Sequence, residues 1–140
     1  MALTARGGSY TRPMPEPSKK PAGARVLVVD DSVDSAETLG ELLRIWGHDV
    51  RLAHDGPAAL EAARDYRPEV ILLDIGLPGM DGFAVAEQLR TGGLQPRMLV
   101  ALTGYGEQTD RQRSQKAGFH HHLVKPVDPE ALQKLISQRA

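Results

Sequence analysis

Val70-Ile71-Leu72-Leu73, followed directly by Asp74, is the stretch of sequence that decides the fold. It is a short, continuous apolar run, and two further runs of this kind lie at residues 26–29 and 98–102. Continuous runs of this length are typical of strands that are buried on both faces of a parallel sheet. The sequence therefore predicts a central parallel sheet that contains at least these three strands.

Two weaker strands and a set of helices complete the pattern. Residues 49–53 alternate apolar and polar side chains, and residues 120–124 can form a short strand. Helical spacing of apolar residues fills the intervals, and in the first helix it is carried by Val33, Ala36, Leu39, Leu43 and Trp46. The predicted helix starts and stops are Asp55, Asp81, Asp128, Gly47 and Gly92-Gly93, whereas either Asp31 or Ser32 can cap the first helix.

Five strands that alternate with five helices predict an α/β fold. We expect a doubly wound, five-stranded parallel sheet in the flavodoxin-like order 2-1-3-4-5, with helices on both faces. One predicted helix, at residues 107–116, is polar on every side. Such a helix gains little from packing, so it is either an ordinary solvated helix or a weakly held element that is available for switching.

The composition is that of one ordinary soluble domain. Of the 140 residues, 41% are hydrophobic and 25% charged, and there is no cysteine, which excludes disulfides and thiolate metal sites. No signal-peptide pattern opens the sequence and no apolar stretch is long enough to cross a membrane, so we expect a cytoplasmic protein that does not bind membranes.

The first 24 residues differ in composition from the rest. They are rich in proline and glycine and have no apolar period, so we predict a flexible tail at 1–24 and a folded domain at 25–140. The tail carries a net charge of +3, which leaves −4 on the remaining residues out of a total of −1. A mildly acidic domain gives no electrostatic reason to expect nucleic-acid binding.

Polar residues follow four of the five predicted strands. Asp30-Asp31 follow the first strand, Asp74 the third, Thr103 the fourth and Lys125 the fifth. Each alone has an ordinary explanation, as a helix cap, a loop residue, a turn residue or a surface lysine. Parallel strands, however, bring their carboxyl ends to one edge, where ligands bind in this kind of sheet. Three carboxylates gathered there repel one another, which favours a hard divalent cation such as Mg²⁺, with Mn²⁺ as an alternative.

Four segments resemble the receiver domains of two-component signalling: residues 28–31, 72–82, 102–104 and 123–126. The resemblance runs from residue 25 to about residue 138. It implies that Asp74 takes a phosphoryl group from a histidine kinase or a histidine phosphotransfer protein, and that the chain catalyses only its own phosphorylation and slow dephosphorylation. It leaves open whether the chain is a stand-alone protein or a segment of a hybrid kinase.

The resemblance also assigns roles to single residues. Asp31 and Asp74 would bind the metal directly, together with the backbone carbonyl of Gly76, and Asp30 would hold a metal-bound water. Lys125 and the Thr103 hydroxyl would each contact a phosphate oxygen, as phosphoryl transfer requires. The Lys125–Pro126 peptide would be cis.

Some positions depart from the family pattern. Position 122, often aromatic in the family, is His122, which could still change rotamer when Thr103 moves. Gly104 replaces a commoner alanine, and Gly76 offers no side chain over the site, where Tyr105 could provide cover. The phosphate lifetime therefore stays open. The output is expected to pass to an unknown downstream protein through the face formed by residues 105–138.

Three alternatives are less consistent with the sequence. An aspartyl-phosphate phosphohydrolase usually needs an acid two residues after the nucleophile, where this chain has Gly76. A receiver-shaped module that no longer takes phosphate would not be expected to keep the whole polar set. A transition-metal site at His120-His121-His122 is disfavoured because neighbouring strand residues point to opposite faces, so at most His120 and His122 share one.

Overall fold

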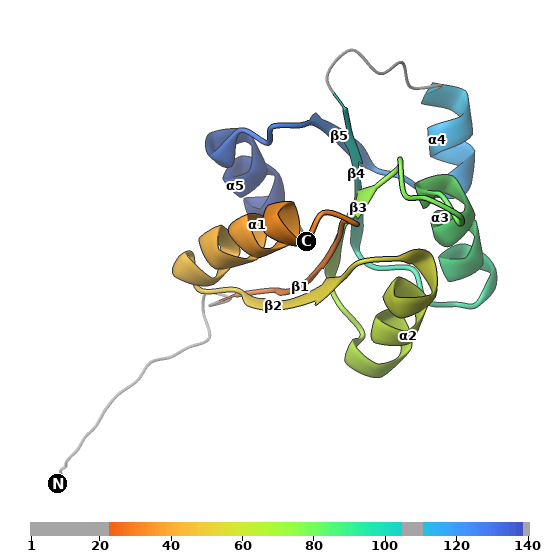
Figure 1. Cartoon of the computed structure of the whole chain (residues 1–140), viewed down its shortest axis with the longest axis horizontal. Coiled ribbons are helices and arrows are strands. Elements are labelled where there is room, and N and C mark those ends of the chain that lie inside the picture. The colour runs from red at the N-terminus through yellow and green to blue at the C-terminus, as the bar shows by residue number, and fades with distance from the viewer. Residues whose placement is uncertain (1–22, 105–110, 139–140) are drawn as a thin grey trace, which may run out of the picture.

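A five-stranded, fully parallel sheet in the order β2-β1-β3-β4-β5 forms the centre of the protein (Figure 1). The computed structural model describes residues 23–104 and 111–138. The strands are β1 (Arg25–Val29), β2 (Asp49–Ala53), β3 (Val70–Asp74), β4 (Met98–Thr103) and β5 (His121–Val124). The predicted strand order is confirmed. From β1 the chain adds β2 on one side and β3 on the other, and a doubly wound sheet has its binding crevice at this switch point, between β1 and β3.

Helices cover both faces of this sheet. They are α1 (Val33–Ile45), α2 (Gly56–Tyr66), α3 (Gly82–Thr91), α4 (Arg111–Ala117) and α5 (Pro129–Ser137). Helices α1 and α5 lie on one face, and α2, α3 and α4 lie on the other (Figure 1). None of the described helices is both long and apolar enough to cross a lipid bilayer.

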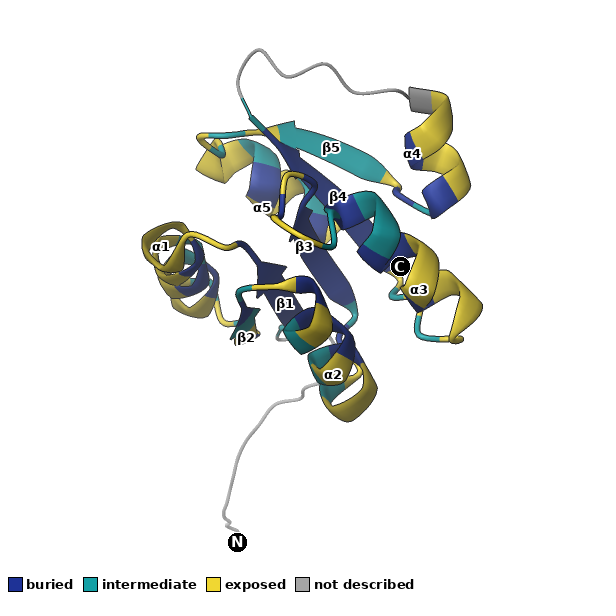
Figure 2. Cartoon of the chain, turned by 45° about the vertical axis from the view of Figure 1, so that its right-hand side comes forward, coloured by how far each residue is buried: buried dark blue, intermediate teal, exposed yellow. Residues whose placement is uncertain are grey.

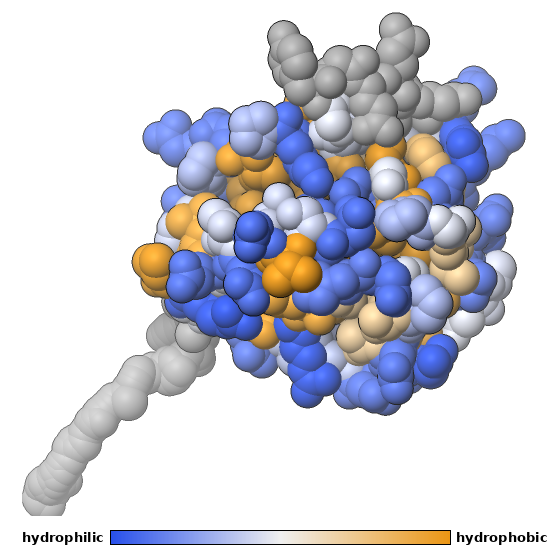
Figure 3. All heavy atoms as spheres, viewed as in Figure 1, coloured by the Kyte–Doolittle hydropathy of each residue, from blue (hydrophilic) through white to orange (hydrophobic). Residues whose placement is uncertain are grey.

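Each central strand supplies both hydrophobic cores. Leu27 and Val29 of β1 belong to the core under α2 and α3, whereas Val26 and Val28 belong to the core under α1 and α5. Burial on both faces explains why the strand is apolar at every position. Figure 2 shows the buried central strands between helices that are exposed on their outer sides. Polar side chains predominate on the face seen in Figure 3, with apolar ones visible between them.

Side chains cap four helices at the expected places. Asp55, Asp81 and Asp128 accept hydrogen bonds from the backbone at the starts of α2, α3 and α5, as predicted. Ser32, rather than Asp31, caps α1 by accepting from Ser35 N at 3.3 Å. The Asp31 carboxylate is therefore not needed for capping.

Two expectations about element positions need correction. Val33 was expected on the buried side of α1 but is 49% exposed, because it is the first helical residue and lies near the rim, beyond the end of β1. Ala24, the last residue of the predicted tail, is buried, and its N–H donates to His48 Nδ1 at 3.0 Å. The rest of that tail, residues 1–22, lies outside the described residues, as do residues 107–110 of the predicted polar helix.

The core contribution of the apolar runs can be tested with two isoleucines. Ile71 of β3 is 1% exposed, and Ile45 at the end of α1 is 79% exposed. Ile71→Ala should lower the free energy of unfolding by about 2–5 kcal/mol, since it leaves a cavity in the core. Ile45→Ala should change it by less than about 0.5 kcal/mol. Urea denaturation measures both, and similar losses in the two variants would contradict the described packing.

Candidate functional site

Three carboxylates meet at the carboxyl ends of β1 and β3. Asp30 and Asp31 follow β1, and Asp74 is the last residue of β3. One carboxylate oxygen from each lies within 4.8 Å of the others. Asp30 and Asp74 are buried, whereas Asp31 is exposed. Within residues 23–104 and 111–138, this is the only group of three or more acidic, histidine or cysteine side chains close enough to share a metal ion.

Lys125 reaches this cluster from the end of β5. Its Nζ lies 3.0 Å from Asp30 Oδ2 and 3.1 Å from Asp74 Oδ2. Partial burial acts to lower the pKa of Lys125, but the hydrogen bonds and negative charges of Asp30 and Asp74 outweigh it and raise the pKa above its ordinary value. The ammonium group therefore stays charged at neutral pH. The Lys125–Pro126 peptide is cis, as expected.

Backbone N–H groups orient the two buried carboxylates. Asp74 Oδ1 accepts from Gly76 N at 2.8 Å, and Asp30 Oδ1 accepts from Ser32 N at 2.9 Å. Each buried carboxylate thus has one oxygen on the backbone and the other on Lys125. The loop that contains Gly76 is itself fixed, because Gly82 at the start of α3 donates to Ile75 O at 3.1 Å. A Cβ on Gly82 would lie only 2.5 Å from Ile75 Cα, so this approach requires glycine.

The donor set fits a hard divalent cation. Three carboxylates face one ammonium group, so the cluster keeps an excess of negative charge. Mg²⁺ prefers oxygen ligands and accepts one or two carboxylates while keeping several waters. The exposed position of Asp31 gives solvent water access to this side of the cluster.

Thr103 links the site to β5. It is the last residue of β4 and is 3% exposed. Its Oγ1 lies 3.5 Å from the carbonyl oxygen of Leu123, and its own carbonyl accepts from Lys125 N at 2.7 Å. Thr103 thus contacts the end of β5 through both its side chain and its backbone.

His122 connects β5 to α4. Its Nε2 lies 2.9 Å from Ser114 Oγ, and its ring lies 6.2 Å from that of Phe119, centroid to centroid. Ser114 is fully buried on α4. The half-buried His122 ring thus occupies the side of β5 that faces this helix, while Tyr105, the predicted cover of the site, lies outside the described residues.

Helix α4 makes contacts that its polar sequence did not predict. Arg113 places its guanidinium carbon 4.1 Å from the centroid of the Phe83 ring and lies 4.0 Å from Asp81 Oδ2. Ser114 and Ala117 form its buried side. A search for an apolar stripe misses these contacts, because an arginine and a serine make them.

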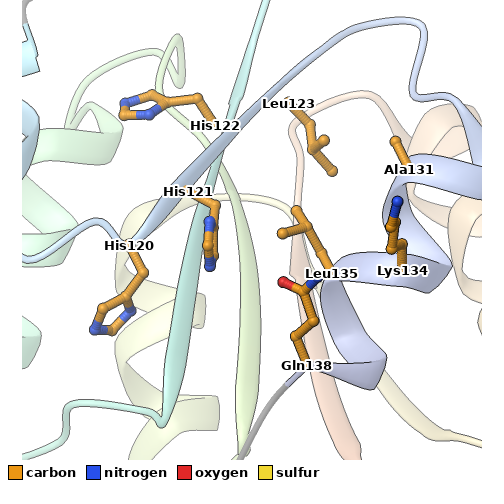
Figure 4. Close-up of a pocket in the computed structure, with 8 residues that line it drawn as sticks. All are labelled: His120, His121, His122, Leu123, Ala131, Lys134, Leu135 and Gln138. Atoms are coloured by element: carbon orange, nitrogen blue, oxygen red, sulfur yellow. The ribbon is translucent and has the colours of Figure 1, made fainter.

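The three consecutive histidines have separate surroundings. His120 Nδ1 accepts from Leu99 N at 2.9 Å, and partial burial, together with the nearby His121, lowers the pKa of His120. A pocket of about 390 Å³ separates this part of β5 from α5 (Figure 4). In that view His121 and Leu123 lie on the opposite side of the strand from His122. The histidine run therefore does not converge on one point.

Sequence reasoning missed one residue at the site, His54. It directly follows β2, and its Nδ1 lies 3.0 Å from the carbonyl oxygen of Asp30. The signal was available, because the rule that identified polar residues at the carboxyl ends of β1, β3, β4 and β5 also applies to β2.

Comparison with known proteins agrees with this architecture. The model of the response regulator receiver domain family matches residues 26–137, and the chain belongs to this family. Receiver domains act in two-component signalling, where they interact with histidine kinases or phosphotransfer proteins.

Relatives of different length share this domain. Protein PilH of Pseudomonas aeruginosa is 35% identical over 115 residues, which cover 81% of this chain and 95% of PilH. The DNA-binding response regulator MtrA of Mycobacterium tuberculosis is 39% identical over 108 residues, which cover 77% of this chain but 46% of MtrA. The chain thus spans about half the length of MtrA. Chemotaxis protein CheY4 of Vibrio cholerae has a similar structure, with a TM-score of 0.77 and 31% identity, over 85% of this chain and 100% of CheY4.

Repulsion within the acidic cluster can be measured without metal. Asp31→Asn should raise the melting temperature at low ionic strength, because it removes one of three neighbouring negative charges. The increase should shrink in about 1 M NaCl, which screens exposed charges. Asp65→Asn on the exposed side of α2 is the matched control. A lower melting temperature for Asp31→Asn than for the wild type, recorded by circular dichroism, would contradict a repulsive cluster.

Proposed function

We propose that the chain takes a phosphoryl group from a histidine kinase or a histidine phosphotransfer protein onto Asp74, in a Mg²⁺-dependent reaction that switches a partner-binding surface. The observation that carries this proposal is the position of Asp74 between two further carboxylates and the Lys125 ammonium group. Membership of the receiver family supports the reaction class.

The proposed reaction transfers the phosphoryl group between two side chains. A carboxylate oxygen of Asp74 attacks phosphorus as the bond from phosphorus to the donor histidine nitrogen breaks, and the product is an aspartyl phosphate. The bond from Gly76 N to Asp74 Oδ1 holds the carboxylate in a fixed orientation. In-line attack depends on such positioning.

The cation would be held by groups already at the site. Asp31, Asp74 and the Gly76 carbonyl would bind it directly, and Asp30 would bind it through water. When bound, Mg²⁺, or Mn²⁺ in its place, would neutralise charge on the phosphoryl oxygens. Asp30 and Asp74 share the Lys125 ammonium group at nearly equal distances, so Lys125 is placed to turn to a phosphoryl oxygen on Asp74 while remaining near Asp30.

A response at the partner surface would start at Thr103. Its hydroxyl would leave the Leu123 carbonyl for a phosphoryl oxygen, and the space vacated beside β5 would be open to the His122 ring. An inward turn of that ring would break its hydrogen bond to Ser114 and so release one contact between β5 and α4. We propose the 105–138 face, of which residues 111–138 are described, as the surface read by the downstream partner.

The residue at position 76 argues against a phosphohydrolase activity. Position 76, where a phosphohydrolase of similar fold usually has its second acid, is an exposed glycine. We therefore propose that the chain is a switch rather than a classical enzyme. We also propose that the folded domain begins by Ala24, which is buried, and that the residues before it form a tail. A cytoplasmic location and no binding to nucleic acid are the remaining parts of the proposal. MtrA is described as DNA-binding, but this chain matches only 46% of it.

The phosphorylation site is tested by a single substitution. Asp74→Asn should abolish incorporation from acetyl phosphate in the presence of Mg²⁺, because the amide is a much poorer nucleophile than a carboxylate. Asp65→Asn should be phosphorylated like the wild type. Intact-mass spectrometry measures the stoichiometry. Full phosphorylation of Asp74→Asn would mean that another residue is the acceptor.

The route from the site to the surface is tested at Thr103. Thr103→Ala should still accept phosphate at Asp74, but the phosphorylation-dependent amide shift changes in residues 121–138 should be strongly reduced. Thr103→Ser keeps a hydroxyl and should retain most of them. Two-dimensional NMR of each variant, before and after phosphorylation, supplies the comparison. Changes of wild-type size in Thr103→Ala would exclude a route through this hydroxyl.

A further inference from the structure

His54 contacts the backbone of Asp30, a member of the acidic cluster. It is half-buried at the end of β2, and its Nδ1 lies 3.0 Å from the Asp30 carbonyl oxygen. A carbonyl oxygen can only accept a hydrogen bond, so Nδ1 must carry the hydrogen. The neutral ring is thereby assigned to the tautomer with hydrogen on Nδ1.

This contact completes the restraint of one backbone segment. Asp30 N donates to Ala53 O at 3.0 Å, and the Asp30 carbonyl accepts from the neighbouring residue, His54. The pairing of β1 with β2 is thus extended beyond both strands by a side chain. The peptide group held in this way is the one that joins Asp30 to Asp31.

The position of the Asp31 carboxylate depends on this peptide more than the positions of the Asp30 and Asp74 carboxylates do. The carboxylates of Asp30 and Asp74 are held directly by backbone N–H groups and by Lys125. Asp31 is exposed, and no hydrogen bond to its carboxylate occurs within the described part of the chain. The backbone on which Asp31 stands is therefore the main restraint on where its carboxylate points.

We propose that His54 is a positioning residue for the cation site. Its Nδ1–H fixes the Asp30–Asp31 peptide so that the Asp31 carboxylate stays within reach of Asp74. This inference rests on the proposed Mg²⁺ site. Groups that orient metal ligands through one hydrogen bond commonly change metal affinity, without themselves touching the metal.

Three variants separate positioning from general packing. His54→Ala removes the donor, His54→Asn places an amide N–H close to the former Nδ1, and His121→Ala removes a histidine on the far side of the sheet. Isothermal titration calorimetry with MgCl₂ alone, at pH 8.5, measures the Mg²⁺ affinity of the wild type and of each variant.

The expected result is a graded one. His54→Ala should bind Mg²⁺ about threefold to tenfold more weakly than the wild type, the effect of losing one neutral hydrogen bond. His54→Asn should recover most of that loss, and His121→Ala should bind like the wild type. Equal affinity in His54→Ala and the wild type would overturn the role of His54 alone. No binding by the wild type would overturn both this role and the proposed Mg²⁺ site.

A second measurement needs neither metal nor a folded alanine variant. The ¹⁵N shifts of the neutral His54 ring in the wild-type protein distinguish the two tautomers. Hydrogen on Nδ1 is the expected state. Hydrogen on Nε2 would show that His54 does not donate to Asp30, and the inference would fail whatever the variants do.

Discussion

The constraint on which this structure depends is the repulsion between carboxylates that the sheet brings to one edge. Asp30 and Asp74 are buried there, and the partners that balance them in residues 23–104 and 111–138 are backbone N–H groups and Lys125. Burying carboxylates without partners would be costly, so Lys125 must reach across from β5. The two carboxylates, one ammonium group and the parallel strands that deliver them form a single interdependent unit.

That unit also explains how a small chemical change could spread. A phosphoryl group on Asp74 would alter the partners of Lys125 and Thr103, which are both joined to the end of β5. The His122 side chain of β5 is in turn hydrogen-bonded to Ser114 of α4. The proposed switch therefore acts through a short series of polar contacts, whereas the two apolar cores can remain as they are.

Local patterns were sufficient to predict most of the fold. The three apolar runs became β1, β3 and β4, and Asp55, Asp81 and Asp128 cap their helices. Long-range geometry could not be derived from the residues alone: nothing local indicates that Lys125 bonds Asp30, 95 residues away in sequence, or that Ser114 is fully buried. His54 could have been found from its place directly after β2, but its bond to the backbone carbonyl of Asp30 could not, because nothing local in the sequence indicates that partner.

The central claim is that the three carboxylates form a divalent-cation site at the end of the sheet. The most direct test is the melting temperature of the unphosphorylated protein during titration with MgCl₂, with NaCl of equal ionic strength as the reference. A ligand that binds only the folded state stabilises it. Once the ligand concentration exceeds Kd, this stabilisation, and with it the melting temperature, increases with the logarithm of the concentration. We expect this rise for Mg²⁺ in the wild type and its loss in Asp74→Ala. Identical curves for MgCl₂ and NaCl would contradict it.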